Sequence, residues 1–115
     1  MNAAREKVER EGQCRVCGAP AEVCDAAHVW NRSQGGPGWD DPDAIVPLCS
    51  RIKGGAGCHD AYDAYQLDLL PYLTTAEQVA LVRYAGSIQR AYDRARGRGV
   101  DAPQRHPDDG PLGLL

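Results

Sequence analysis

Four of the five cysteines are spaced as two pairs that could ligate a single metal ion. Cys14 and Cys17 form a Cys-x2-Cys turn, which brings two thiolates to one tetrahedral ion while backbone N–H groups of the turn face the sulfurs. Cys49 and Cys58 stand farther apart than the usual two to four residues, but the Gly-rich segment 54–57 between them is flexible enough to close such a loop. We therefore predict a structural zinc site formed by these four thiolates.

Two alternatives compete with this assignment. The thiols could remain without a metal, or His59, which directly follows Cys58, could replace one cysteine in a knuckle of three cysteines and one histidine. Cys24 is left out of both arrangements, and we expect it to be a small buried residue. Paired cysteines favour a metal over a disulfide in a reducing compartment.

A second set of metal-ligand types follows the cysteines directly. His59 and Asp63 are four residues apart, so they share one face of a helix if the chain is helical there. A mixed nitrogen and oxygen site of this kind, with positions left open for water, suits Mg²⁺ or Mn²⁺.

The surrounding sequence predicts an α+β domain. The chain of 115 residues has no Phe, so its core is thin and a metal would help to hold it. Hydrophobic patterning, caps and breakers predict a helix over 2–11 that Asn2 caps and Gly12 ends, strands over 21–30 and 44–48, and a helix from 58 or 59 to about 70. An amphipathic helix should follow to about 96, and it should begin at a capping box of either Thr74 with Glu77 or Thr75 with Gln78. The expected organisation is an N-terminal helix (1–12), a core (13–73), a C-terminal helix (74–96) and a disordered tail (97–115).

The order of these motifs resembles one nuclease family. Ala27-His28-Val29, Arg32-Ser33-Gln34-Gly35-Gly36, Ile45-Val46-Pro47-Leu48-Cys49 and Cys58-His59 follow one another as in the HNH endonucleases, and most closely as in small phage-type members with a four-cysteine zinc knuckle. The resemblance covers roughly residues 12–73. It implies a ββα-metal core that hydrolyses phosphodiester bonds of DNA.

The resemblance also implies roles for individual residues. His28, at the end of the first strand, would be the general base, a role that suits the pKa of a neutral histidine. His59 and Asp63 would hold the catalytic Mg²⁺ or Mn²⁺, with Asp25 as a further ligand, and Arg32 would contact a DNA phosphate.

Two positions depart from the family pattern. Ala27 stands where the family usually has a metal-ligating His or Asp, and Ala44 stands where the central Asn is expected, with Asp43 as a neighbouring substitute. These losses motivate an alternative, a catalytically inactive zinc-knuckle module that binds nucleic acid. The net charge of −3 motivates another, a structural zinc domain that binds a protein such as a phage packaging or replication component.

No apolar run approaches the ~18 residues that a membrane-spanning helix requires. We therefore expect no membrane partner and an intracellular location, in the cytoplasm of a bacterial or phage-infected cell.

Overall fold

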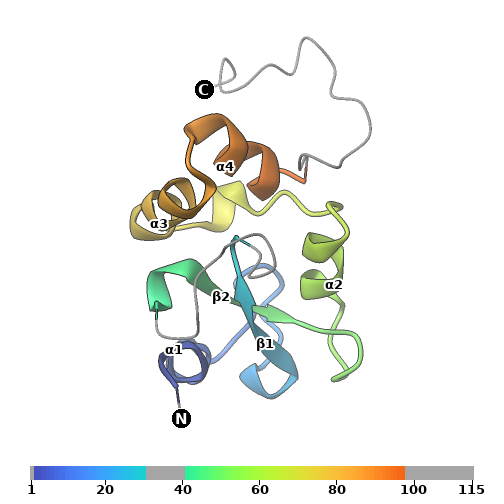
Figure 1. The fold of residues 1–115 in the computed structure, drawn as a ribbon. Helices are drawn as coiled ribbons and strands as arrows, with labels where there is room; N and C mark the ends of the chain where they lie inside the picture. Colours follow the sequence, from blue (N-terminus) through green and yellow to red (C-terminus); the bar gives the residue numbers. More distant parts are fainter. Residues whose placement is uncertain (1, 31–40, 98–115) are drawn as a thin grey trace.

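The computed structural model describes residues 2–30 and 41–97. Within them, helix α1 precedes a two-stranded sheet, and three further helices follow it (Figure 1). The helices are α1 (Ala3–Glu11), α2 (Cys58–Asp63), α3 (Thr75–Ala85) and α4 (Ile88–Ala95), and the strands are β1 (Cys24–His28) and β2 (Ile45–Cys49). Figure 1 shows α1 and α2 on either side of the sheet, with α3 and α4 together at one end of it.

β1 and β2 pair antiparallel, with Cys24 opposite Cys49 and His28 opposite Ile45. All five residues of β2 are buried, whereas in β1 only Cys24 and Ala27 are buried and the other three residues are half-buried. β2 is therefore the centre of the packed domain, and β1 presents part of its length toward solvent. Pro47 lies in β2, which has β1 as its partner within the described residues, as the expected edge position requires.

The first helix forms where the sequence predicts it. The Asn2 side chain accepts a hydrogen bond from the Arg5 N–H at 2.8 Å, and Gly12 ends the helix in the left-handed conformation at φ +77°. One face of the helix packs on the sheet, with Ala4 and Val8 buried, and the other faces solvent.

The helix expected from Cys58 to about residue 70 is much shorter, which corrects the prediction. α2 ends at Asp63, and Tyr65 turns the backbone into the left-handed region at φ +60°. The reason is tertiary: the guanidinium of Arg94 in α4 lies 3.7 Å and 4.5 Å from the ring centroids of Tyr62 and Tyr65. Packing against α4 thus overrides local helix propensity.

Two other boundaries also differ from the prediction. The C-terminal helix expected over 74–96 is split into α3 and α4 at Gly86, whose φ of +85° ends α3, and at Ser87, which caps α4. The strand expected over 21–30 is shorter, since β1 covers only Cys24–His28 and Ala21–Val23 forms a 3₁₀ turn before it. The capping box of Thr74 and Glu77 is confirmed.

The structure confirms a mixed helix and strand domain compatible with the α+β class. None of the described helices is long and apolar enough to cross a membrane. The predicted disordered tail falls almost entirely on residues 98–115, which lie outside the described residues.

Candidate metal centre and adjoining polar site

The four predicted zinc ligands converge. The Sγ atoms of Cys14, Cys17, Cys49 and Cys58 all lie within 4.8 Å of one another, and the pair Cys17–Cys49 is 3.5 Å apart. Four thiolates around one zinc at about 2.3 Å would lie about 3.8 Å apart, so the cluster has the dimensions of a tetrahedral zinc site. The arrangement is therefore compatible with a structural zinc ion.

Electrostatics in the cluster also favour a bound cation. Burial would raise the pKa of Cys49, but hydrogen bonds from the backbone N–H groups of Cys58 and Gly57 and from Cys17 lower it to about 6. By contrast, burial and the neighbouring Cys49 raise the pKa of Cys58. Four thiols this close cannot all ionise unless a positive charge lies between them.

The backbone holds the cysteine turns tightly in place. The Cys14 N–H donates to the Ala19 carbonyl at 2.7 Å, and the Arg15 N–H donates to the Pro47 carbonyl of β2 at 2.9 Å. At Gly55, an added Cβ would lie 2.6 Å from the Cβ of Cys49, so only glycine fits beside this ligand. The first cysteine turn is thus tied to β2, the strand that ends at Cys49.

Cys24 and His59 both lie outside the cluster of four thiols. Cys24 is fully buried, and its Sγ faces the Pro20 carbonyl at 3.4 Å, as expected for a residue outside the metal cluster. The imidazole of His59 points toward β1 instead of the cluster, and the four converging ligands are all cysteines.

A second polar site adjoins the cluster, where β1 faces α2. Nδ1 of His59 lies 2.8 Å from Oδ2 of Asp25, and Nζ of Lys53 lies 2.7 Å from Oδ1 of the same carboxylate. Burial alone would raise the pKa of Asp25, but the hydrogen bonds from Lys53 and His59 outweigh it and hold that pKa below its ordinary value. These three side chains line a surface pocket of about 340 Å³ together with Asn2, Arg5 and Ala26.

Asp63 lies on the other side of the same imidazole. Its Oδ2 is 3.4 Å from Nε2 of His59, and its Oδ1 is 4.0 Å from Nη2 of Arg94. One metal ion binds one nitrogen of a given imidazole, so Asp25 and Asp63, as placed, cannot both join His59 around a single ion. Among the described residues, the four cysteines alone bring three or more such ligand atoms together.

His28 is the last residue of β1 and is half-buried. Side chains alternate along a strand, so Asp25 and Ala27 share one face and His28 lies on the other, about 10 Å farther along the strand than Asp25. The phenol of Tyr62 in α2 donates to the carbonyl of Val29 at 2.7 Å, which ties α2 to the end of this strand.

Other predicted positions have no visible part in the site. Asp43 is exposed, and its backbone N–H donates to Oδ1 of Asp41 at 3.2 Å, while Ala44 is fully buried. Trp30 packs in the core, with the Arg90 guanidinium 5.3 Å from its ring centroid. Arg32, the predicted phosphate contact, lies outside the described residues.

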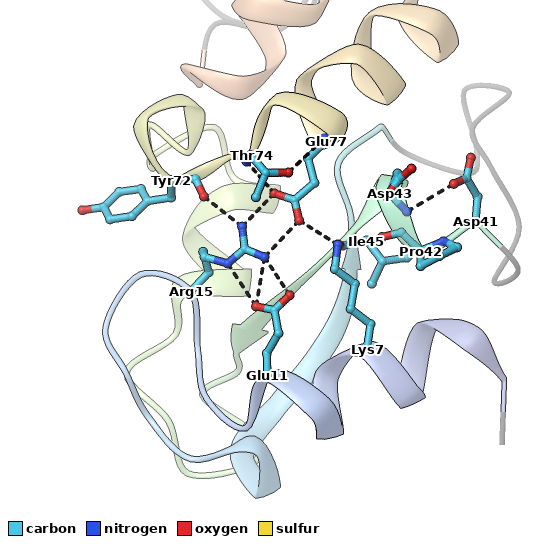
Figure 2. Close-up of polar contacts among 10 residues, drawn as sticks. All are labelled: Lys7, Glu11, Arg15, Asp41, Pro42, Asp43, Ile45, Tyr72, Thr74 and Glu77. Atoms are coloured by element: carbon cyan, nitrogen blue, oxygen red, sulfur yellow. Dashed lines mark hydrogen bonds and ion pairs between the residues drawn. The ribbon is translucent and has the colours of Figure 1, made fainter.

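A largely buried network of charges links the first cysteine turn to the helices (Figure 2). Arg15, between the first two cysteines, donates to both oxygens of Glu77 in α3 at 2.7 Å and 2.9 Å, and also contacts Glu11 at 2.8 Å. Nζ of Lys7 donates to Glu77 at 2.7 Å and to the carbonyls of Pro42 and Ile45. The network joins α1, the cysteine turn, β2 and α3.

Sequence patterns did not predict the ion pairs of Lys53, Lys7, Arg15 or Arg94. Each is a long cation whose partner is distant in the sequence, at separations of 28 to 70 residues. Glu77 was recognised only as part of a capping box.

Fold and site together define a small mixed helix and strand domain built around a four-cysteine metal-type cluster, with a histidine and carboxylate site beside it. Comparison with known protein families, with curated proteins and with solved structures found no match to this chain.

Proposed function

We propose that this protein is a metal-dependent DNA endonuclease of the HNH type, in which β1, β2 and α2 form the ββα-metal unit. The observation that supports this most directly is the contact between Oδ2 of Asp25 in β1 and Nδ1 of His59 in α2, at 2.8 Å. His59 directly follows Cys58, a predicted zinc ligand. Strand, strand and helix therefore bring metal-ligand types together in the order that the sequence motifs suggest.

The residues present fit a divalent ion with few protein ligands. His59 would hold it together with Asp63 or Asp25, and waters and phosphate oxygens would complete the coordination, as is usual for Mg²⁺ or Mn²⁺. When bound, the ion would supply positive charge to the scissile phosphate and to the leaving oxygen.

His28 would act as the general base. A neutral imidazole accepts a proton from water near neutral pH, and the activated water then attacks phosphorus.

Positive charge for the DNA backbone would come from the loop between the second pair of cysteines. Arg51 and Lys53 are both exposed there, and Lys53 reaches the pocket beside His59. Local cations of this kind can bind phosphates although the whole chain carries a net charge of −3.

A second candidate function is a zinc-stabilised nucleic-acid-binding module that does not cut. Ala27 offers no ligand, and both oxygens of Asp25 already have partners in Lys53 and His59. This alternative predicts salt-dependent DNA binding without cleavage.

A plasmid-nicking assay separates the two functions. Zinc-loaded protein is incubated with supercoiled DNA and Mg²⁺ or Mn²⁺, and nicked or linear product is quantified for the unsubstituted chain, His28→Ala and the control His106→Ala. The nuclease predicts cleavage that falls at least about 100-fold in His28→Ala, the usual contribution of a general base, and stays unchanged in His106→Ala. No cleavage with either ion, or equal cleavage by His28→Ala, would refute the proposal.

A further inference from the structure

Asp25 makes contacts that a positioning residue makes. Both of its carboxylate oxygens are engaged, Oδ2 by Nδ1 of His59 at 2.8 Å and Oδ1 by Nζ of Lys53 at 2.7 Å. The carboxylate is about one-quarter exposed, so these contacts are partly shielded from water. An ion that bound Asp25 directly would have to displace one of these two partners.

The contact with His59 also specifies where the ring carries its proton. An ionised carboxylate can only accept a hydrogen bond, so Nδ1 of His59 is the protonated nitrogen. When the ring is neutral, Nε2 carries the lone pair, and it faces Oδ2 of Asp63 at 3.4 Å. No hydrogen bond joins these two atoms in the part of the chain that the structure describes.

This pattern matches the general chemistry of histidine as a metal ligand. A ligating imidazole usually donates its other N–H to a carboxylate or carbonyl, and that partner fixes the tautomer and the orientation of the ring. We propose that Asp25, held by Lys53, is a positioning residue that orients His59, and that the divalent ion binds on the opposite side of the ring, between Nε2 of His59 and Asp63. The position of the ion rests on the proposed function, whereas the tautomer of His59 does not.

The arrangement also accounts for the missing ligand at Ala27. Asp25 points to the same face of β1 as Ala27, but its carboxylate accepts a hydrogen bond from Nδ1 of His59 and so does not bind the ion directly. β1 therefore contributes to the ion site indirectly, because its Asp25 orients the imidazole of His59. Lys53, from the loop of the zinc knuckle, keeps Asp25 in place.

The first test measures the tautomer without any divalent ion added. Long-range proton–nitrogen NMR correlations of zinc-loaded, nitrogen-15-labelled protein distinguish the two ring nitrogens, and the three histidines of the chain are assigned with His28→Ala and His106→Ala. At a pH where the ring is neutral, we expect His59 to be protonated on Nδ1 in the unsubstituted protein and in Asp25→Asn, whose amide oxygen still accepts. Asp25→Ala should lose this preference. Protonation on Nε2 in the unsubstituted protein would overturn the inference.

The second test measures Mn²⁺ affinity by titration calorimetry of the zinc-loaded protein. We expect Asp25→Ala to weaken binding about 10- to 100-fold, as for other outer-shell partners of a ligating histidine, and Asp25→Asn to restore most of it. Asp63→Asn should weaken binding more than Asp25→Asn does, because it removes the charge of a direct ligand.

The pair Lys53→Met and Arg51→Met then separates positioning from direct ligation. Each variant removes one exposed cation from the same loop, but only Lys53 contacts Asp25. If Asp25 positions His59, Lys53→Met should bind Mn²⁺ no more tightly than Arg51→Met, and up to about fivefold more weakly, because the carboxylate loses the cation that holds it. If Asp25 were itself the ligand, Lys53→Met would remove a competitor and bind up to about fivefold tighter than Arg51→Met, which is the value of an exposed ion pair. That result would overturn the inference.

Circular dichroism and zinc content confirm that each variant is folded. Absence of Mn²⁺ binding to the unsubstituted protein would overturn both the ion site and the nuclease proposal. The opposite tautomer with intact Mn²⁺ binding and DNA cleavage would overturn only the positioning role of Asp25.

Discussion

Replacing Glu77 with glutamine is expected to lower the free energy of unfolding by about 3 kcal/mol at pH 7. The side chain is almost fully buried and accepts hydrogen bonds from Arg15 and Lys7 and from the backbone N–H of Thr74. Burial alone would raise the pKa of Glu77, but these donors outweigh it and hold that pKa at about 2, against 4.5 for an unperturbed glutamate. Each unit of pKa corresponds to about 1.4 kcal/mol, which gives the expected magnitude. Removing one partner from a buried ion pair costs a similar amount, about 3–5 kcal/mol.

Urea unfolding of the zinc-loaded protein measures this change, with Glu9→Gln as the matched control. Glu9 pairs with Arg5 at 2.6 Å, but its side chain is 50% exposed, so its loss should cost less than about 1 kcal/mol. A double-mutant cycle with Lys7→Met tests the coupling: the combined loss should be smaller than the sum of the single losses, because the two charges no longer lie unpaired. A loss below about 1 kcal/mol for Glu77→Gln, or strict additivity with Lys7→Met, would refute the assignment of a buried charge network.

The pH dependence follows from the same depressed pKa. A carboxylate with a lowered folded-state pKa contributes stability that is fully present above its unfolded-state pKa near 4.5 and is lost as the pH falls through about 2. The destabilisation by Glu77→Gln should therefore be the same at pH 7 and pH 5.5. A difference that shrinks over this range would show that Glu77 titrates there, contrary to the network of donors around it.

Two further predictions concern the cysteine cluster. Elemental analysis should find one zinc per chain. Cys17→Ser should lose this zinc and unfold more readily although Cys17 is exposed, whereas Cys24→Ala should keep its zinc although Cys24 is fully buried. The reverse pattern would contradict the four-cysteine assignment. Gly55→Ala should lower stability by about 1–3 kcal/mol and weaken zinc retention in a chelator competition, because the added Cβ would lie 2.6 Å from Cys49; unchanged retention would mean that the loop can shift away.

The parts of the fold that follow from local rules could be predicted from the sequence. The cap at Asn2, the Gly12 stop and the capping box at Thr74 are each satisfied by neighbouring residues, so the sequence contains the whole cause. The cysteine cluster could be predicted for a related reason, because thiolate spacing and a Gly-rich loop limit how the chain can close.

The errors arose where distant residues decide the structure. α2 stops at Asp63 because Tyr62 and Tyr65 pack on Arg94, about 30 residues later, and no local pattern reports that contact. The break at Gly86 and Ser87 is a different case: a left-handed glycine followed by a capping serine is a local stop and start, and the regular apolar spacing across it concealed the break.

In the candidate catalytic site, too, the local spacing could be predicted and the contacts between distant residues could not. The spacing of His59 and Asp63 predicts a shared helix face, and the structure places them 3.4 Å apart at their nearest polar atoms. The sequence spacing could not reveal that Asp25 approaches Nδ1, the other nitrogen of the His59 ring. That contact depends on the register of β1 against β2 and on where α2 lies over the sheet. Lys53 is invisible to motif analysis for the same reason.

The metal cluster and the polar site are coupled through the start of α2. Cys58 is the first residue of this helix and His59 is the second, so a bound zinc would fix the backbone from which the imidazole extends. Asp25 is the second residue of β1, and the Tyr62 phenol donates to the carbonyl of Val29, which ties the other end of α2 to the residue after this strand. Because α2 is only six residues long, its own hydrogen bonds cannot hold it in place, and the zinc knuckle with the Tyr62 contact must do so. A structural zinc in this position would therefore do more than stabilise a thin core, since it would set the distance between the histidine of the helix and the carboxylate of the strand.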